Sequence, residues 1–189
     1  MFNYILNKFR KPLSINYINK QLRSKGIATH PYDEHYLTFK LYDMNWDIYC
    51  DGLRLGLRTT FSLDNDMDNE CLQKTTNKLN YERWGIKVYI EETTRDDDRE
   101  EGKESSPIII FSFESLCYSE LDFMNQYEYA IYTLTDAIEF YRKSYIEFVK
   151  EKESAAASTH PIGFNTPNRN NEERGTVENK KTKTKIGFV

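Results

Sequence analysis

The sequence predicts an α+β domain, in which a long C-terminal helix packs on an antiparallel β-sheet of about five strands. Two observations carry this prediction. Within residues 36–63, apolar and polar side chains alternate along three runs joined by short turns, which is typical of antiparallel strands. Within residues 125–152, apolar side chains recur every three or four positions, which is the spacing of one helix face. The expected order of elements is α-βββ-α-ββ-α.

The composition limits the class of protein. The 189 residues include 30% charged and 39% apolar side chains, with a formal net charge of −4. This excludes a fibrous or wholly disordered chain, and the negative charge makes nucleic acid an unfavoured partner. No apolar run approaches the roughly 20 residues that cross a bilayer. We therefore expect no transmembrane segment. The three cysteines, Cys50, Cys71 and Cys117, are odd in number and widely spaced, so we expect reduced thiols and a cytoplasmic protein.

Three parts are expected along the chain: an N-terminal extension at residues 1–12, a domain at 13–152, and a flexible polar and basic tail at 153–189. The extension has apolar residues at helical spacing beside basic ones. It is either a membrane-surface helix or, as we favour, a short helix packed on the domain. The tail repeats the triplet Ile-Gly-Phe at residues 162–164 and 186–188. These triplets are either docking motifs for a partner or chance repeats.

The first elements have local signals at their ends. Residues 15–25 form a predicted helix, which begins after the N-cap residue Ser14 and ends at Gly26. Three strands follow, at residues 36–42, 46–51 and 53–63. We expect the turns between these strands at residues 43–45 and 51–52, of which the second, Asp-Gly, is a typical hairpin sequence.

The second half contains a further helix and two further strands before the long helix. A helix at residues 69–80 begins after the N-cap residue Asp68 and precedes a strand at 86–90. A charged loop at residues 91–106 separates this strand from an apolar strand at 108–113.

The long helix has the strongest pattern in the chain. Asn125 and Glu128 form a capping box at its predicted start, and the helix should reach about Lys152. It either lies across the sheet, as we favour, or also pairs with a second copy of the chain to form a homodimer. Its apolar stripe consists of Tyr127, Ile131, Leu134, Ile138, Tyr141, Tyr145 and Phe148.

No pattern in the sequence predicts catalysis, a cofactor or a metal ion. His30 and His35, with acidic residues between them, do not have a spacing that fixes a zinc ion on a loop. The acidic run that begins at Asp64 resembles the start of an EF-hand loop, but Asn69 and Thr75 replace the required glycine and glutamate. We therefore expect neither an enzyme nor a cofactor or metal site.

We expect binding of a protein partner on the polar face of the sheet and on exposed aromatics of the long helix. Arginines and tyrosines on a sheet can also stack on single-stranded nucleic acid. Cross-strand pairing with Asp47 or Asp51 accounts for the arginines as well, and edge packing accounts equally well for each tyrosine taken singly. The candidate contact residues are Tyr36, Lys40, Tyr49, Arg54 and Arg58 on the sheet, and Tyr129, Tyr132 and Tyr141 on the helix.

The order of elements that begins at residue 71 is similar to that of a known protein family. Residues 71–80 form an amphipathic helix that ends in an Asn-x-x-Asn pattern at Asn77 and Asn80, and two strands and the terminal helix follow. This arrangement resembles the YbjN-type family, whose fold is that of type III secretion chaperones, over about residues 13–150. The resemblance implies a small acidic binding module, often dimeric, that holds an extended segment of a partner. It implies no catalytic residues.

The sequence thus predicts a non-enzymatic protein-binding module, chaperone-like or adaptor-like, with an unidentified protein partner. The alternative is an accessory protein that associates with an anionic membrane or nucleic acid through its basic termini. Those termini are residues 1–11 and the lysine cluster at residues 180–185.

Overall fold

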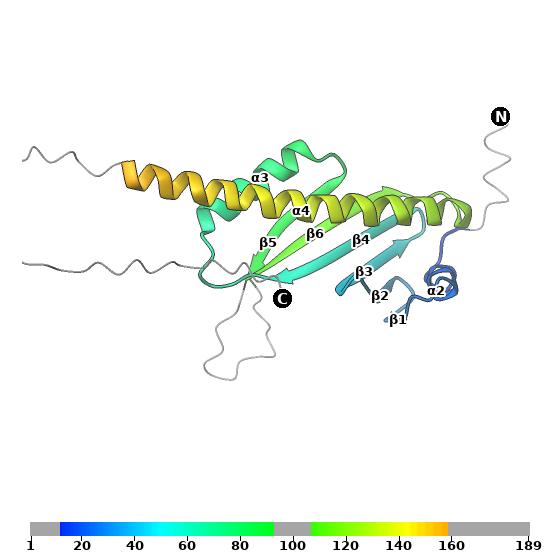
Figure 1. The fold of residues 1–189 in the computed structure, drawn as a ribbon. Coiled ribbons are helices and arrows are strands. Elements are labelled where there is room, and N and C mark those ends of the chain that lie inside the picture. Colours follow the sequence, from blue (N-terminus) through cyan, green and yellow to red (C-terminus); the bar gives the residue numbers. More distant parts are fainter. Residues whose placement is uncertain (1–11, 93–106, 159–189) are drawn as a thin grey trace, which may run out of the picture.

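The computed structural model describes residues 12–92 and 107–158, which form a six-stranded sheet and three helices (Figure 1). The strands lie in the order β1-β2-β3-β4-β6-β5, and every neighbouring pair is antiparallel. The predicted α+β class is confirmed. The elements are α2 (Ile15–Ser24), β1 (Thr29–Pro31), β2 (Tyr36–Leu41), β3 (Met44–Asp51), β4 (Arg54–Ser62), α3 (Asn69–Glu82), β5 (Ile86–Glu92), β6 (Pro107–Leu116) and α4 (Glu120–Ser158).

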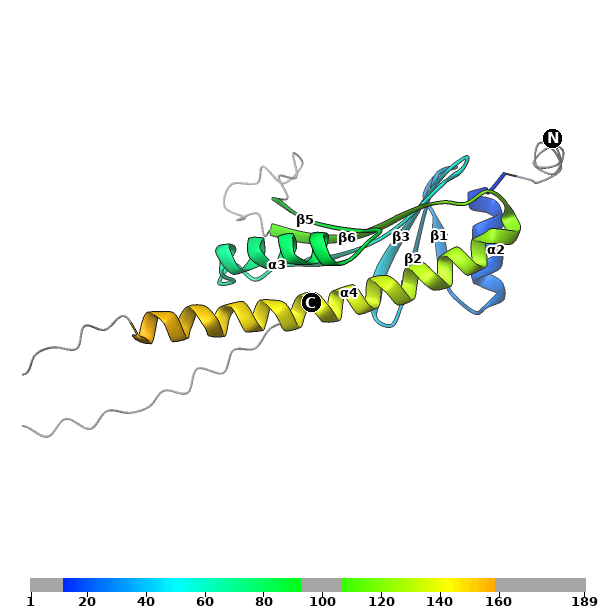
Figure 2. The ribbon, with the colours of Figure 1, turned by 90° about the horizontal axis from the view of Figure 1, so that it is seen from above.

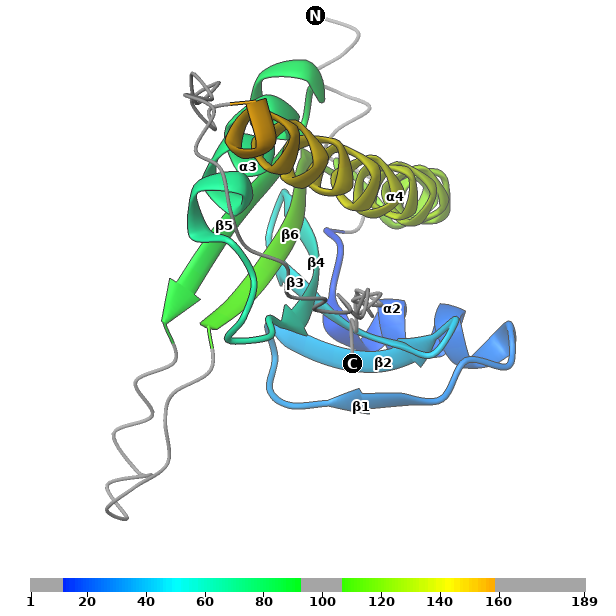
Figure 3. The same ribbon diagram turned by 60° about the vertical axis from the view of Figure 1, so that its left-hand side comes forward.

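The helices form a second layer on one face of the sheet. α4 lies across β4, β6 and β5, and α3 lies beside it along β5 (Figure 2). α2 packs against β1 and β2, which the twist of the sheet turns away from β5 and β6 (Figure 3). Along β4, Leu55, Leu57, Thr59 and Phe61 are buried under the helices, while the residues that alternate with them are more exposed. This strict alternation leaves the other face of the strand outside the core.

The predicted N-caps of α2 and α3 are confirmed, and α2 ends close to the predicted Gly26, whereas α3 continues two residues past its predicted end, to Glu82. The Ser14 hydroxyl accepts a hydrogen bond from the N–H of Tyr17 (3.3 Å), and Gly26 after α2 has a φ of +80°. At the start of α3, the Asp68 carboxylate accepts a hydrogen bond from the N–H of Cys71 (2.9 Å). Both helices therefore begin where their N-cap side chains satisfy a free backbone donor.

Two details of the sheet differ from the prediction. A sixth strand, at residues 29–31, pairs with β2, but a strand of this length that ends in proline has no alternation pattern to detect. The first hairpin turn lies at Tyr42 and Asp43, with φ of 53° and 59°, and not at residues 43–45. Two successive residues with positive φ form the tight turn that matches the strand twist, so β3 already begins at Met44.

The long helix extends beyond both predicted ends. It spans Glu120–Ser158, which is 39 residues and about 58 Å. The capping box predicted at Asn125 is wrong because the chain is already helical there. Just before the helix, the carbonyl of Ser119 accepts a hydrogen bond from the N–H of Asp122 (3.1 Å). Residues 153–158, which we assigned to the tail, continue the helix, because their alanines are strong helix formers.

Several predictions lie outside the described residues. These concern the extension through residue 11, the loop at 93–106, and the tail from residue 159 with both Ile-Gly-Phe triplets. The alternative function rests on the same termini and stays a prediction, as do the domain boundaries. Of the helices described here, none combines the length and the apolar composition needed to cross a bilayer.

Candidate protein-binding site

The sheet face opposite α3 and α4 carries most of the residues that the sequence singles out. Strand pairing aligns its side chains in rows that cross the strands. One row consists of Tyr36, Tyr49, Gly56 and Glu114. The next row consists of Thr38, Asp47, Arg58, Ser112 and Lys87. We call this surface the open face of the sheet.

A groove of about 630 Å³ lies on the open face, over β3, β4 and β6. Tyr36, Tyr49, Arg54 and Arg58, all predicted as contact residues, line it. The structure therefore brings four of the predicted side chains into one concave surface. Lys40 does not line it, because it lies farther along β2, where it pairs with Asp43 (3.5 Å).

Polar contacts hold the groove side chains in place. Arg58 Nε lies 3.0 Å from Asp47 Oδ2, which is one of the cross-strand pairs that the sequence allowed. The Tyr49 hydroxyl donates a hydrogen bond to Asp51 Oδ2 (3.2 Å). The centroids of the Tyr36 and Tyr49 rings are 5.0 Å apart. The pKa of Tyr49 is raised, mainly by desolvation and to a smaller extent by the hydrogen bond to Asp51. This phenol therefore stays neutral at physiological pH and acts as a donor.

The tyrosines of α4 belong to another surface. Tyr129 and Tyr132 are 57% and 74% exposed, and they lie on the helix layer, on the opposite side of the sheet from the groove. One short segment could not contact both surfaces without passing around an edge of the sheet. The two sets of predicted residues are thus separate candidates.

The expectation that Tyr141 is an exposed contact residue is wrong. Its side chain is fully buried, with its ring 5.5 Å from that of Phe111. The hydroxyl donates to the carbonyl of Leu72 (3.2 Å) and lies 3.2 Å from Thr76 Oγ1. Burial raises the pKa of Tyr141 to about 12. The helical stripe already placed this residue toward the sheet, and hydrogen bonds within the core satisfy its hydroxyl.

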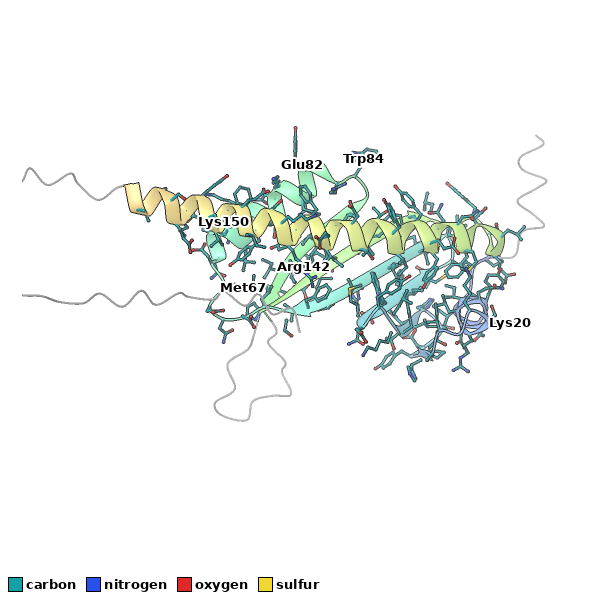
Figure 4. The ribbon with its side chains drawn as sticks, viewed as in Figure 1. Lys20, Met67, Glu82, Trp84, Arg142 and Lys150 are labelled. Carbon is teal, nitrogen blue, oxygen red and sulfur yellow. The ribbon has the colours of Figure 1, made fainter. Side chains whose placement is uncertain are left out.

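The sequence analysis missed some exposed and groove-lining residues. Trp84, in the turn between α3 and β5, is 97% exposed (Figure 4), and Tyr81 nearby is 89% exposed. In the groove, Tyr89 of β5 and Glu114 of β6 complete the lining. The alternation along each strand places these two side chains on the open face, but only the pairing of β6 with β4 brings them to the groove.

Metal-binding clusters and reactive cysteines were two further kinds of site to consider among the described side chains. No group of His, Cys, Asp and Glu in residues 12–92 and 107–158 is arranged to hold a metal ion. Cys50, Cys71 and Cys117 are free and buried, and burial raises the pKa of each thiol, for Cys50 to about 11. Thiols held protonated in this way are poor nucleophiles.

The comparisons with known proteins concern the fold. No family model matches the chain, and no curated protein matches its sequence. The structure is similar to that of YbjN from E. coli, described as a candidate transcription regulator, with a TM-score of 0.50 and 8% identity over 68% of this chain and 91% of YbjN. An uncharacterised protein from Methanothermobacter thermautotrophicus gives a TM-score of 0.44 and 12% identity, over 69% of this chain and 97% of that one. The chain thus has a YbjN-like fold, and membership of that family stays a prediction.

Proposed function

We propose that this protein is a non-enzymatic binding module, chaperone-like or adaptor-like, that holds an extended segment of a partner protein on the open face of its sheet. The observation that carries the proposal is the groove over β3, β4 and β6, which is lined by tyrosines and arginines on a face that none of the three described helices covers. Concave surfaces with aromatic walls and a few fixed polar groups are the usual form of binding sites.

The charge of the groove favours a peptide over nucleic acid. Arg54, Arg58 and Lys87 are balanced by Asp47, Asp51 and Glu114 on the same face. Binding of a single-stranded nucleic acid needs a positively charged path for the phosphates, which this balance does not supply. A peptide with both polar and apolar side chains matches the mixed lining. A role as an adaptor is also consistent with the regulatory description of YbjN.

The test is a selection of short random peptides on the full chain, followed by affinity measurements on the peptides recovered. Tyr49→Ser and Tyr89→Ser each remove a ring from the groove. We expect each to weaken binding at least about tenfold, because a few aromatic side chains dominate such interfaces. Tyr132→Ser is the matched control, since it removes an exposed ring from the helix layer.

The expected result is a peptide whose affinity falls in both groove variants and stays within about twofold of wild type in the control. Peptides that bind as tightly to the groove variants as to wild type would contradict the proposal. Peptides lost only in Tyr132→Ser would move the binding surface to α4.

A further inference from the structure

We infer that the groove binds a partner segment that carries an aromatic side chain, and that the ring of this side chain lies over Gly56. This inference rests on the proposed function. Gly56 is in the middle of β4, half-buried on the open face. It lies in the groove between Tyr49 on β3 and Glu114 on β6, and contributes no side chain to it. The floor of the groove is therefore bare backbone at this point.

The fold does not require a glycine at this position. Gly52 in the neighbouring hairpin has a φ of +59°, whereas Gly56 lies outside the left-handed region. A Cβ added to Gly56 would have Tyr49 Cβ as its nearest neighbour, at 3.7 Å, which is an ordinary contact. Glycine weakens a strand interior, and it often marks a place where a ligand approaches the backbone closely. Gly56 lines the groove, and no positive φ explains why a glycine stands there.

The side chains around the gap are suited to a ring. Arg54 and Arg58 flank Gly56 along β4 and point to the same face. Guanidinium planes and tyrosine rings both stack on aromatic rings. Arg58 is held by Asp47 at 3.0 Å, so its plane is positioned before a ligand arrives.

The local charges disfavour an anion at the same place. Glu114 is a direct neighbour of Gly56 across the strands, and Asp47 neutralises Arg58. A phosphate or carboxylate over Gly56 would therefore meet a carboxylate as well as Arg54. A neutral ring gains stacking energy without that repulsion.

A purely structural role for this pair is the competing explanation. An aromatic residue opposite a strand glycine can cover it and stabilise the sheet, and Tyr49 Cδ1 lies 3.9 Å from the position of a Cβ on Gly56. However, the Tyr49 hydroxyl is bonded to Asp51, two positions along its own strand. The two explanations differ in one measurable respect: if Tyr49 covers Gly56, a larger side chain at 56 must lower stability.

The experiment uses the groove-dependent peptides from the selection described above and the full chain with Gly56→Val. Valine favours strands, so we expect the midpoint of thermal unfolding to stay equal or rise. The affinity should fall at least about tenfold, because the side chain fills the floor. Thr60→Val is the matched control, since Thr60 is exposed on the same strand. Gly56→Ala, with a smaller side chain, serves if the valine variant does not fold.

The peptide is varied in parallel, and each of its aromatic residues is replaced by leucine. We expect one replacement to weaken binding to wild type at least about tenfold, and to have little further effect on Gly56→Val, since the two changes remove the same contact. Groove-dependent peptides that keep their affinity for Gly56→Val, or that tolerate every aromatic replacement, would overturn this inference and leave the proposed function intact. An absence of groove-dependent peptides would instead overturn the proposed function.

Discussion

The side-chain amide of Asn80 forms two hydrogen bonds with the backbone of Val88. The amide nitrogen donates to the carbonyl of Val88 and the amide oxygen accepts its N–H, both at 2.8 Å. Val88 lies in β5, which is an edge strand that pairs with β6 on its other side. Asn80 therefore supplies the pair of bonds that a neighbouring strand would supply, and it protects this edge from pairing with another chain.

Replacing Asn80 with alanine should lower the free energy of unfolding by about 1 kcal/mol, because it leaves two backbone groups of Val88 without their partner. Urea unfolding measures this difference. Asn77→Ala is the control, since Asn77 is exposed one turn earlier on the same helix. Equal stability of the two variants would show that the Asn80 bonds contribute nothing.

The contact of Lys152 with Asp68 and Glu70 should make stability depend on pH under acidic conditions. Lys152 Nζ lies 2.7 Å from Asp68 and 2.8 Å from Glu70. The hydrogen bond from Lys152, and then the N–H of Cys71, lower the pKa of Asp68 to about 2. Because the folded state holds this proton less tightly than the unfolded state, the stabilisation is complete above the ordinary aspartate pKa. It is lost as the pH falls from about 4 to about 2.

Asp68→Asn removes the charge and retains a good N-cap side chain. The variant should be less stable than wild type at neutral pH, and the difference should disappear near pH 2. Thermal unfolding across this pH range provides the measurement. Glu139→Gln, which breaks an exposed pair with Lys143 within α4, should show little of this behaviour. A difference for Asp68→Asn that does not change with pH would contradict the assignment.

Tyr141→Phe should lower the free energy of unfolding by about 1 kcal/mol at neutral pH, because the buried hydroxyl donates a hydrogen bond to the carbonyl of Leu72. The exposed Tyr132→Phe should change stability by less than about 0.5 kcal/mol. Since burial raises the pKa of Tyr141 to about 12, the folded state holds the phenolic proton more tightly than the unfolded state. The stability that Tyr141 confers should therefore decline as the pH rises above about 10. Urea unfolding at neutral and alkaline pH tests this, and equal effects of the two variants would refute the burial of Tyr141.

The homodimer stays a prediction, and the helix layer offers it a surface. Arg83 joins the α3–β5 turn to α4 through an ion pair with Asp136 (3.0 Å), and Trp84 and Tyr132 are both exposed in this region. A dimer through this surface would give twice the mass of 22.5 kDa in light scattering on the full chain, whereas the arrangement that we favour, with α4 only lying across the sheet, gives the single-chain mass. Tyr132→Glu should restore the single-chain mass, whereas Tyr32→Glu, at an equally exposed loop tyrosine, should not. A single-chain mass for wild type would rule the dimer out.

Much of the sheet could be predicted because burial alternates locally. The period of two along β2, β3 and β4 assigned Tyr36, Tyr49, Arg54 and Arg58 to one face, and these residues do line one groove. The sequence could not predict which strand lies beside β4, since that pairing joins residues 54–62 to residues 108–116. For this reason Glu114 and Tyr89 were missed.

The remaining differences also have physical causes. β1 is too short to show a period. At the start of α4, Ser119 and Asp122 do have the spacing of a capping box, and the Ser119 hydroxyl donates a hydrogen bond to Asp122 Oδ2 (2.8 Å), so this local signal was missed. A tyrosine such as Tyr141 has both an apolar ring and a polar hydroxyl, so residue type alone does not decide its burial. Gly56 looks like any other glycine in the sequence. Only its ordinary strand conformation and its place in the groove show that its missing side chain matters to the surface.

The central claim is that a partner segment binds on the open face of the sheet. The most direct measurement is the change in backbone amide NMR shifts of the full chain when a selected peptide is added. We predict that the largest changes occur at Tyr49, Gly56 and Ser112, on three neighbouring strands of the groove. Changes confined to Trp84 and Tyr132, with the groove amides unmoved, would contradict the account.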